Sequence, residues 1–225
     1  MTAPATQGAA VLLSGGLDSA VLLVETRGRY SPVHPLYVRS GLAWESAEQF
    51  WLQKYLEQVD QPGIAPLRVL ELPVADLYPS HWSVTGKMVP DAQTPDEAVY
   101  LPGRNLLLLA KAAIYCSMAD LHVIALGTLQ GNPFADSTPE FFHAYETLLA
   151  AALKCPISIE TPFRRQTKHT VIRLGKDLPL ELTFSCIDPA GYAHCGRCNK
   201  CQERRLAFAR AGLEDPTEYA AVARR

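Results

Sequence analysis

The stretch "AAVLLSGGLDSAVLLVE" occupies residues 9–25. It begins as an apolar run, breaks at two glycines between two serines, and continues with apolar residues at helical spacing. A buried strand, a glycine turn and the start of a helix would gather main-chain N–H groups around an anion. Glycine lets the backbone approach a ligand closely, and the helix dipole favours negative charge at that end. The pattern therefore predicts a phosphate-binding loop.

Two well-known phosphate loops do not fit this stretch. It lacks the Gly-Lys-Ser/Thr ending of a Walker loop and the Gly-x-Gly-x-x-Gly of dinucleotide folds. A tight turn with a serine N-cap is the simpler interpretation. The complete string Ser-Gly-Gly-x-Asp-Ser directly after the first strand, however, resembles the pyrophosphate loop (PP-loop) of the ATP pyrophosphatases. This resemblance implies an ATP site formed by Leu13, Ser14, Gly15, Gly16, Leu17, Asp18 and Ser19.

The aspartate of this loop, Asp18, needs its own explanation. A carboxylate beside phosphates is repelled unless it accepts hydrogen bonds from backbone amides or helps to hold Mg²⁺. We therefore expect Mg²⁺ together with ATP at the loop.

Apolar runs and helical patterns alternate along the rest of the chain. Strands are expected at residues 9–13, 33–38, 67–72, 121–126 and 157–159, and helices at 17–26, 43–58, 105–118, 139–153, 167–174 and 200–211. This alternation predicts an α/β fold with a doubly wound, mostly parallel sheet, which binds ligands beyond the carboxyl ends of its strands. Residues 78–96, with three prolines and little periodicity, are expected to form a long loop of the kind that often covers a site.

Composition limits the classes of partner. With 225 residues, 48% of them hydrophobic, the chain can bury one sizeable core. A formal charge of −2 argues against binding of long nucleic acid, which requires a basic excess. No segment is apolar and long enough to span a bilayer, and residues 1–7 do not resemble a signal peptide, so we expect a cytoplasmic protein. The sequence allows a homodimer but does not fix the oligomeric state.

Four cysteines near the end of the chain form the second strong signal. Cys195, Cys198 and Cys201 repeat at three-residue spacing, and Cys186 precedes them. Four thiolates can close on one tetrahedral Zn²⁺ and leave no open position, which predicts a structural zinc site. Four buried cysteines without metal are the alternative, and His194 could replace one ligand. We expect residues 1–180 to form the PP-loop domain and residues 181–225 a zinc-binding and helical segment packed on the same core.

Taken together and in this order, the two motifs resemble the QueC (ExsB-like) family of PP-loop proteins. "YLPGRN" at residues 100–105, "TPFRRQTKHTVIRLG" at 161–175 and "LTFSC" at 182–186 resemble segments of that family, and the likeness extends from residue 9 to about residue 212. It implies ATP-dependent conversion of 7-carboxy-7-deazaguanine and ammonia to the nitrile through an adenylated carboxylate, for queuosine-type nucleosides. ATP, Mg²⁺ and Zn²⁺ are the implied cofactors, and the partners are small molecules.

The resemblance also implies roles for individual residues. Lys168 would neutralise charge on the phosphates, although it could also be a solvated lysine on a helix face. Arg104 and Asn105 begin a helix where a carboxylate or phosphate would be stabilised, or they form only a helix cap. Asp136 would contact substrate or Mg²⁺, or act as the N-cap ahead of Pro139.

The chain departs from the family after its second strand. Where family members usually carry an Asn-Gln or Tyr-Gly-Gln segment, this chain reads "YVRSGLAWE", and Leu17 replaces a usual glutamine. Arg39 stands at this place and could pair with the acceptor carboxylate or with a phosphate. The alternative is an ion pair with Glu45 or Glu48 on the following helix.

These departures leave other functions open. A QueC-like paralogue could adenylate a deazaguanine carboxylate or another small carboxylate and join it to a different amine. A zinc-containing regulator without ATP turnover is a non-enzymatic alternative. A tRNA-modifying pyrophosphatase such as a thiolase is disfavoured, because it usually needs a catalytic cysteine pair and the metal would occupy four of the six cysteines.

Overall fold

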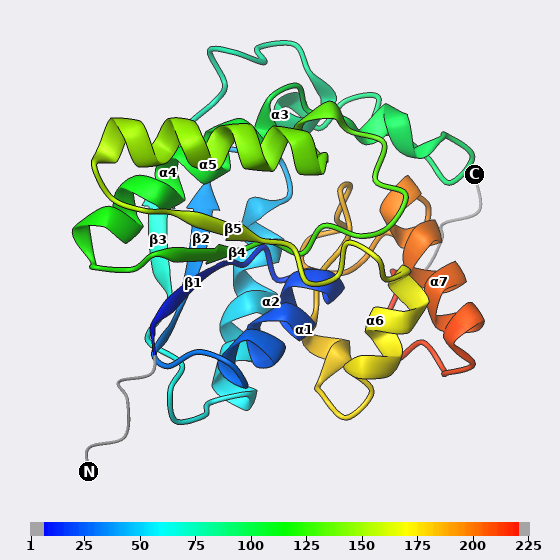
Figure 1. The fold of residues 1–225 in the computed structure, drawn as a ribbon. Coiled ribbons are helices and arrows are strands. Elements are labelled where there is room, and N and C mark those ends of the chain that lie inside the picture. Colours follow the sequence, from blue (N-terminus) through cyan, green and yellow to red (C-terminus); the bar gives the residue numbers. More distant parts are fainter. Residues whose placement is uncertain (1–6, 221–225) are drawn as a thin grey trace.

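A five-stranded sheet in the order β3-β2-β1-β4-β5 forms the centre of the protein (Figure 1). The computed structural model describes residues 7–220. Every neighbouring pair of strands is parallel, which confirms the predicted sheet. The strands are β1 (Ala9–Leu12), β2 (Val33–Arg39), β3 (Arg68–Glu71), β4 (Val123–Ala125) and β5 (Ser158–Glu160).

Helices cover both faces of this sheet (Figure 1). β1 is entirely buried, and its alternate residues face two different apolar clusters: Val11 packs with α1, α6 and α7, whereas Leu12 packs with α4 and α5. The helices are α1 (Leu17–Arg27), α2 (Glu45–Gln58), α3 (Trp82–Thr85), α4 (Arg104–Met118), α5 (Pro139–Leu153), α6 (Lys168–Leu174) and α7 (Asn199–Ala211).

The strand order places a crevice at the carboxyl end of β1. The chain leaves β1 towards β2 on one side and later returns to β4 on the other, so the connections diverge there. Ligands of doubly wound sheets bind at such a point. The loop after β1, which contains the predicted phosphate site, lies at this edge together with the loops after β2 and β4.

The long segment predicted as an irregular loop is more ordered than expected. It contains α3, which His81 caps by accepting a hydrogen bond from the backbone of Ser83 and which ends at Gly86 in the left-handed region (φ 66°). Trp82 stacks on Trp44, with ring centroids 5.6 Å apart. The predicted long loop is therefore interrupted by one short helix, which local capping and aromatic packing order without helical periodicity in the sequence.

The same segment is also attached to the cysteine-rich part of the chain. The N–H of Ala92 donates to the carbonyl of Arg197 at 2.9 Å, and the N–H of Asn199 donates to the carbonyl of Pro90 at 3.0 Å. These bonds hold the segment against the start of α7.

The C-terminal segment shares the central core. Ala207 and Phe208 of α7 belong to the apolar cluster that contains α1 and β1. The predicted PP-loop domain begins, and the predicted zinc-binding segment ends, in residues that the structure does not describe, 1–6 and 221–225. The prediction about a signal peptide concerned residues 1–7, so it also lies almost entirely outside the described residues. None of the helices between residues 7 and 220 combines the length and the apolar character needed to cross a membrane.

Candidate active site and metal centre

The phosphate loop joins β1 directly to α1. Gly15 has a φ of 80°, a conformation that glycine adopts without strain, and a Cβ there would lie 3.2 Å from Leu52. Gly16 is the N-cap of α1 and has no side chain to bond the first amides of the helix. The simpler alternative of a serine N-cap is therefore wrong. The first N–H groups of α1 remain oriented toward the space beyond the strand, as an anion site requires.

The side chains of the loop divide into two groups. Ser14 and Ser19 hold the turn together, since their hydroxyls lie 3.2 Å apart and the N–H of Ser14 donates to Ser19 Oγ at 3.2 Å. Leu13 and Leu17 bury their side chains in the core, so only their main-chain atoms can contact a ligand.

Asp18 extends from the first turn of α1 into the site. Its Oδ2 lies 3.3 Å from Lys168 Nζ, whereas its Oδ1 is buried and has no hydrogen-bond partner in the structure. Burial raises the pKa of Asp18, and the Lys168 ammonium opposes this rise. A buried carboxylate oxygen without a partner beside a phosphate loop fits a divalent cation, since Mg²⁺ prefers carboxylate and phosphate oxygens.

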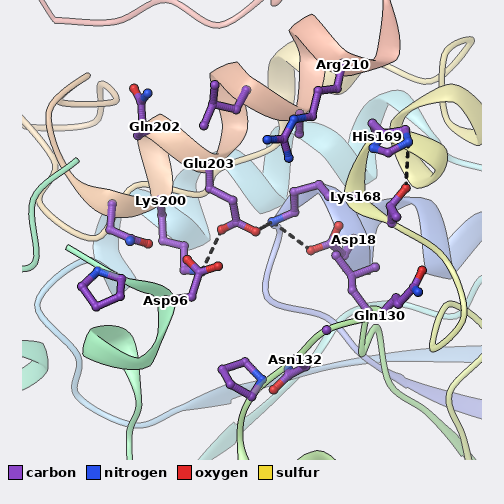
Figure 2. A pocket seen from close by; sticks show the side chains of 18 of the residues that line it. Asp18, Asp96, Gln130, Asn132, Lys168, His169, Lys200, Gln202, Glu203 and Arg210 are labelled. Carbon is purple, nitrogen blue, oxygen red and sulfur yellow. Dashed lines mark hydrogen bonds and ion pairs between the residues drawn. The ribbon is translucent and has the colours of Figure 1, made fainter. Parts of the chain in front are cut away.

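Lys168 is the centre of a chain of charges that runs from α1 through α6 to α7 (Figure 2). Besides Asp18 it contacts Glu203 Oε1 at 2.7 Å, and Lys200 contacts the second oxygen of Glu203 at the same distance. Burial lowers the pKa of Lys168, but the carboxylates of Asp18 and Glu203 outweigh it and raise the pKa. Only 18% of the Lys168 side chain is exposed, so it is not a solvated lysine on a helix face.

Glu203 was not recognised in the sequence. Burial alone would raise its pKa, yet Lys168 and Lys200 lower it to about 2, so the carboxylate stays ionised. It stands two residues after Cys201 and 35 residues after Lys168, and no local sequence pattern links it to Lys168.

Two adjoining pockets open around Asp18. The outer pocket has a volume of about 590 Å³ and lies between α6, α7, the loop after β4 and residues 92–96 (Figure 2). The inner pocket has a volume of about 260 Å³ and lies at the carboxyl ends of β1, β2 and β4. Asp18, Gly127 and Asn132 line both, so the phosphate loop connects the two spaces.

Arg104 and Asn105 line the inner pocket from the first turn of α4. Asp136 does not line either pocket. Its Oδ2 instead accepts a hydrogen bond from the N–H of Asn105 at 2.9 Å, while Asn105 Nδ2 donates to the carbonyl of Asp136 at 3.1 Å. The N-cap of α5 is Thr138, which accepts from the N–H of Phe141 at 3.1 Å. The alternative that made Asp136 the cap ahead of Pro139 was therefore wrong.

Asp136→Ala should destabilise the protein because it leaves the N–H of Asn105 without its acceptor. We expect a loss of about 1–2 kcal/mol in the free energy of unfolding, typical of a lost helix cap. Urea unfolding followed by circular dichroism measures this change. Asp177→Ala, at an exposed position, is the control and should leave the unfolding midpoint unchanged. Equal midpoints for all three proteins would contradict the capping role.

Arg39 lies at the surface, at the end of β2. It pairs with Glu71 Oε1 at 3.4 Å across the β2–β3 edge and lines neither pocket. The alternative of a pairing with Glu45 or Glu48 was wrong. Glu45 accepts hydrogen bonds from the N–H groups of Ser40 and Gly41, and Glu48 accepts one from Tyr37. A substrate role for Arg39 stays a prediction.

The four cysteines of the C-terminal motif converge. Their sulfur atoms all lie within 4.8 Å of one another, with Cys186 and Cys198 at 3.9 Å and Cys195 and Cys201 at 4.0 Å. A tetrahedral ion with zinc–sulfur bonds of about 2.3 Å separates its ligands by about 3.8 Å, so the cluster fits a metal ion closely. All four residues are buried, and no fifth donor belongs to the cluster within the described part of the chain.

His194 is not part of this cluster. Its Nε2 accepts a hydrogen bond from the N–H of Ser185 at 3.1 Å, and its ring packs on Phe184. Phe184 in turn donates its N–H to the carbonyl of Gly15 at 2.8 Å. The segment that leads to Cys186 is thereby hydrogen-bonded to the phosphate loop.

Solved structures resemble this fold at low sequence identity. A predicted subunit of a tRNA methyltransferase from Methanocaldococcus jannaschii matches 96% of this chain and 94% of its own, with a TM-score of 0.51 and 14% identity. A 4-thiouridine synthetase in complex with RNA and bound ATP matches 92% of this chain and 50% of its own, with a TM-score of 0.52 and 17% identity. These likenesses support the PP-loop fold.

Relatives found by sequence share more identity with this chain than these solved structures do, and they align with nearly its whole length. The 7-cyano-7-deazaguanine synthase of Methanopyrus kandleri is 33% identical over 93% of this chain and 97% of its own length. The synthase of Anaeromyxobacter dehalogenans is 31% identical over 94% of this chain and 95% of its own length. Residues 8–212 match the family described as "Queuosine biosynthesis protein QueC". The chain therefore belongs to the QueC family.

Proposed function

We propose that this protein is an ATP-dependent synthase that converts 7-carboxy-7-deazaguanine and ammonia to 7-cyano-7-deazaguanine. The observation that carries the proposal is that Asp18 of the phosphate loop lies beside Lys168 and keeps its Oδ1 buried without a hydrogen-bond partner. This arrangement suits the binding of ATP together with Mg²⁺ and the release of pyrophosphate from that ATP. The curated relatives that share 31–33% of the sequence carry the name of this synthase.

The chemistry requires two activations. A carboxylate is a poor electrophile, and adenylation converts it into one with AMP as leaving group. Attack by ammonia gives an amide, and activation of the amide oxygen then permits dehydration to the nitrile. Both activations form a C–O–P linkage at the same loop. Two molecules of ATP therefore bind there in turn, and each is converted to AMP and pyrophosphate.

Each residue around the loop takes a part in this proposal. The first N–H groups of α1 bind phosphate oxygens, Asp18 holds Mg²⁺, and Lys168 neutralises charge on the departing pyrophosphate. Arg104 and Asn105 face the acceptor in the inner pocket, and Asp136 orients Asn105. The four thiolates hold Zn²⁺ as a structural ion. We place this reaction in the cytoplasm, where ATP and its small-molecule substrates are found.

The direct test is incubation of the full chain with ATP, Mg²⁺, ammonium and 7-carboxy-7-deazaguanine, followed by mass spectrometry. We expect the nitrile together with AMP and pyrophosphate. Formation of ADP and orthophosphate would contradict adenylation. A chain that consumes ATP but forms no nitrile from this carboxylate would contradict the assigned substrate.

Arg39→Ala tests the predicted contact with the carboxylate. The side chains of the Arg39–Glu71 pair are 56% and 59% exposed, so exchanging this ion pair for a contact with a ligand costs little. We expect the KM for the carboxylate to rise about tenfold, as for the loss of one charge-assisted hydrogen bond, with the KM for ATP unchanged. Glu71→Ala breaks the same ion pair and is the matched control. Identical kinetics of the two variants would exclude a substrate role.

A further inference from the structure

Glu48 is a buried carboxylate that the steps above leave unused. It belongs to α2, is 7% exposed and lines the inner pocket next to the phosphate loop. Its Oε2 accepts a hydrogen bond from the hydroxyl of Tyr37 on β2 at 2.7 Å. This hydrogen bond and one from the side chain of Trp44 orient the carboxylate in the wall of the pocket.

Three charged side chains line the inner pocket. Asp18 and Glu48 are its two carboxylates, and Arg104 is its one lysine or arginine. Asp18 is paired with Lys168, whereas neither Glu48 nor Arg104 belongs to any ion pair in residues 7–220. Arg104 Nε is buried and has no hydrogen-bond partner. The pocket can therefore hold an anionic group at Arg104 and a small cation at Glu48 at the same time.

The proposed reaction needs such a cation site. Near neutral pH, ammonia exists mainly as ammonium, which has no lone pair for attack. We propose that Glu48 binds the ammonium ion in the inner pocket and accepts its proton, as the general base of the amide-forming step. This role rests on the proposed function.

The step balances without a further reactant. Ammonium gives one proton to the Glu48 carboxylate, and the freed lone pair forms the C–N bond to the acyl carbon. The bond between that carbon and the AMP oxygen breaks, and its electron pair leaves on AMP. The nitrogen is cationic after the attack and releases a second proton to water, which gives the neutral amide. Glu48 then also releases its proton to water.

The electrostatic surroundings of Glu48 support this role. Burial raises the pKa of Glu48 to about 7. Arg104 from α4 and the hydrogen bonds from Tyr37 and Trp44 oppose this rise, whereas Glu45 on the same helix adds to it. A general base is most effective when its pKa is near the working pH. Burial raises the pKa of Tyr37, so its hydroxyl remains a hydrogen-bond donor.

Glu48→Gln separates proton transfer from binding and folding. Glutamine has nearly the same shape and can still accept from Tyr37, but it cannot take a proton. The full-length variant is supplied with ATP, Mg²⁺ and 7-carboxy-7-deazaguanine, and with either ammonium or hydroxylamine. Hydroxylamine is largely unprotonated at pH 7, so its attack on the adenylate, measured as hydroxamate, needs no base to free the lone pair.

We expect the ammonium-dependent rate to fall about 10²–10⁴-fold, the usual contribution of a general base, while hydroxamate formation stays near that of the wild type. ATP–pyrophosphate exchange should also persist. Glu57→Gln, an exposed glutamate on the same helix, is the matched control and should behave as the wild type.

Equal losses with both nucleophiles, or an unchanged ammonium rate, would overturn the role of Glu48. If Glu48→Gln does not fold, Glu48→Asp replaces it, and a loss confined to ammonium again supports the proposal, whereas an equal loss overturns it. Absence of exchange and of hydroxamate in the wild type would overturn the proposed function itself, and with it this role. Retained exchange with no selective effect would overturn only the role of Glu48.

Discussion

Asp18→Asn should reduce turnover about 10²–10³-fold, comparable with the loss of one preorganised electrostatic contact to a transition state. The substitution keeps the shape of the side chain but removes the charge that we assign to Mg²⁺. The fold should remain, because Lys168 keeps its contact with Glu203 Oε1 at 2.7 Å. The measurement is the initial rate of AMP and pyrophosphate release at several Mg²⁺ concentrations, with the thermal unfolding midpoint recorded in parallel.

The Mg²⁺ dependence distinguishes this role from a merely structural one. If Asp18 holds the ion, the variant needs more Mg²⁺ for half-maximal activity. Asp60→Asn, an exposed position after α2, is the matched control and should show the wild-type dependence. A turnover within a few-fold of the wild type would show that the unpartnered Oδ1 of Asp18 has no part in catalysis.

Strands and helices were predicted well where local pattern decides them. Apolar runs marked all five strands, but the run at residues 121–126 is longer than β4 (Val123–Ala125). Leu121 is buried for another reason: its N–H donates to the carbonyl of Cys116 and so closes the end of α4. An apolar pattern reports burial, and burial extends beyond the hydrogen-bonded strand.

The two motifs located the site because each consists of residues close in the sequence. Glu48 was seen only as an ion-pair partner, since its contact with Tyr37 depends on how α2 crosses the end of β2. The ion-pair partner of Arg39 was missed for a similar reason. Its partner Glu71 is its direct neighbour in the parallel register of β2 and β3, which no local pattern specifies. Long-range pairings of polar side chains thus require the register of the folded sheet.

Cys198→Ser should destabilise the whole protein rather than only the cysteine cluster. A hydroxyl is a poor zinc ligand, so the ion should be lost. Cys198 is the N-cap of α7, and this helix contributes Phe208 to the central core and Glu203 to the contact with Lys168. If on the order of 4 kcal/mol is lost with the metal, the Tm falls by roughly 8–16 °C. Elemental analysis and calorimetry measure both effects.

The phosphate loop should loosen in the same variant, because the metal fixes the peptide to which that loop is bonded. Phe184 donates to the carbonyl of Gly15 at 2.8 Å and is only two residues from Cys186. Amide hydrogen exchange of residues 13–19 should therefore accelerate in Cys198→Ser at temperatures well below its Tm, together with a loss of ATP affinity. Cys155→Ser, outside the cluster and half-buried, is the matched control and should keep about one zinc per chain. Unchanged exchange at the loop in a metal-free variant would show that the phosphate site is held by α1 and α2 alone.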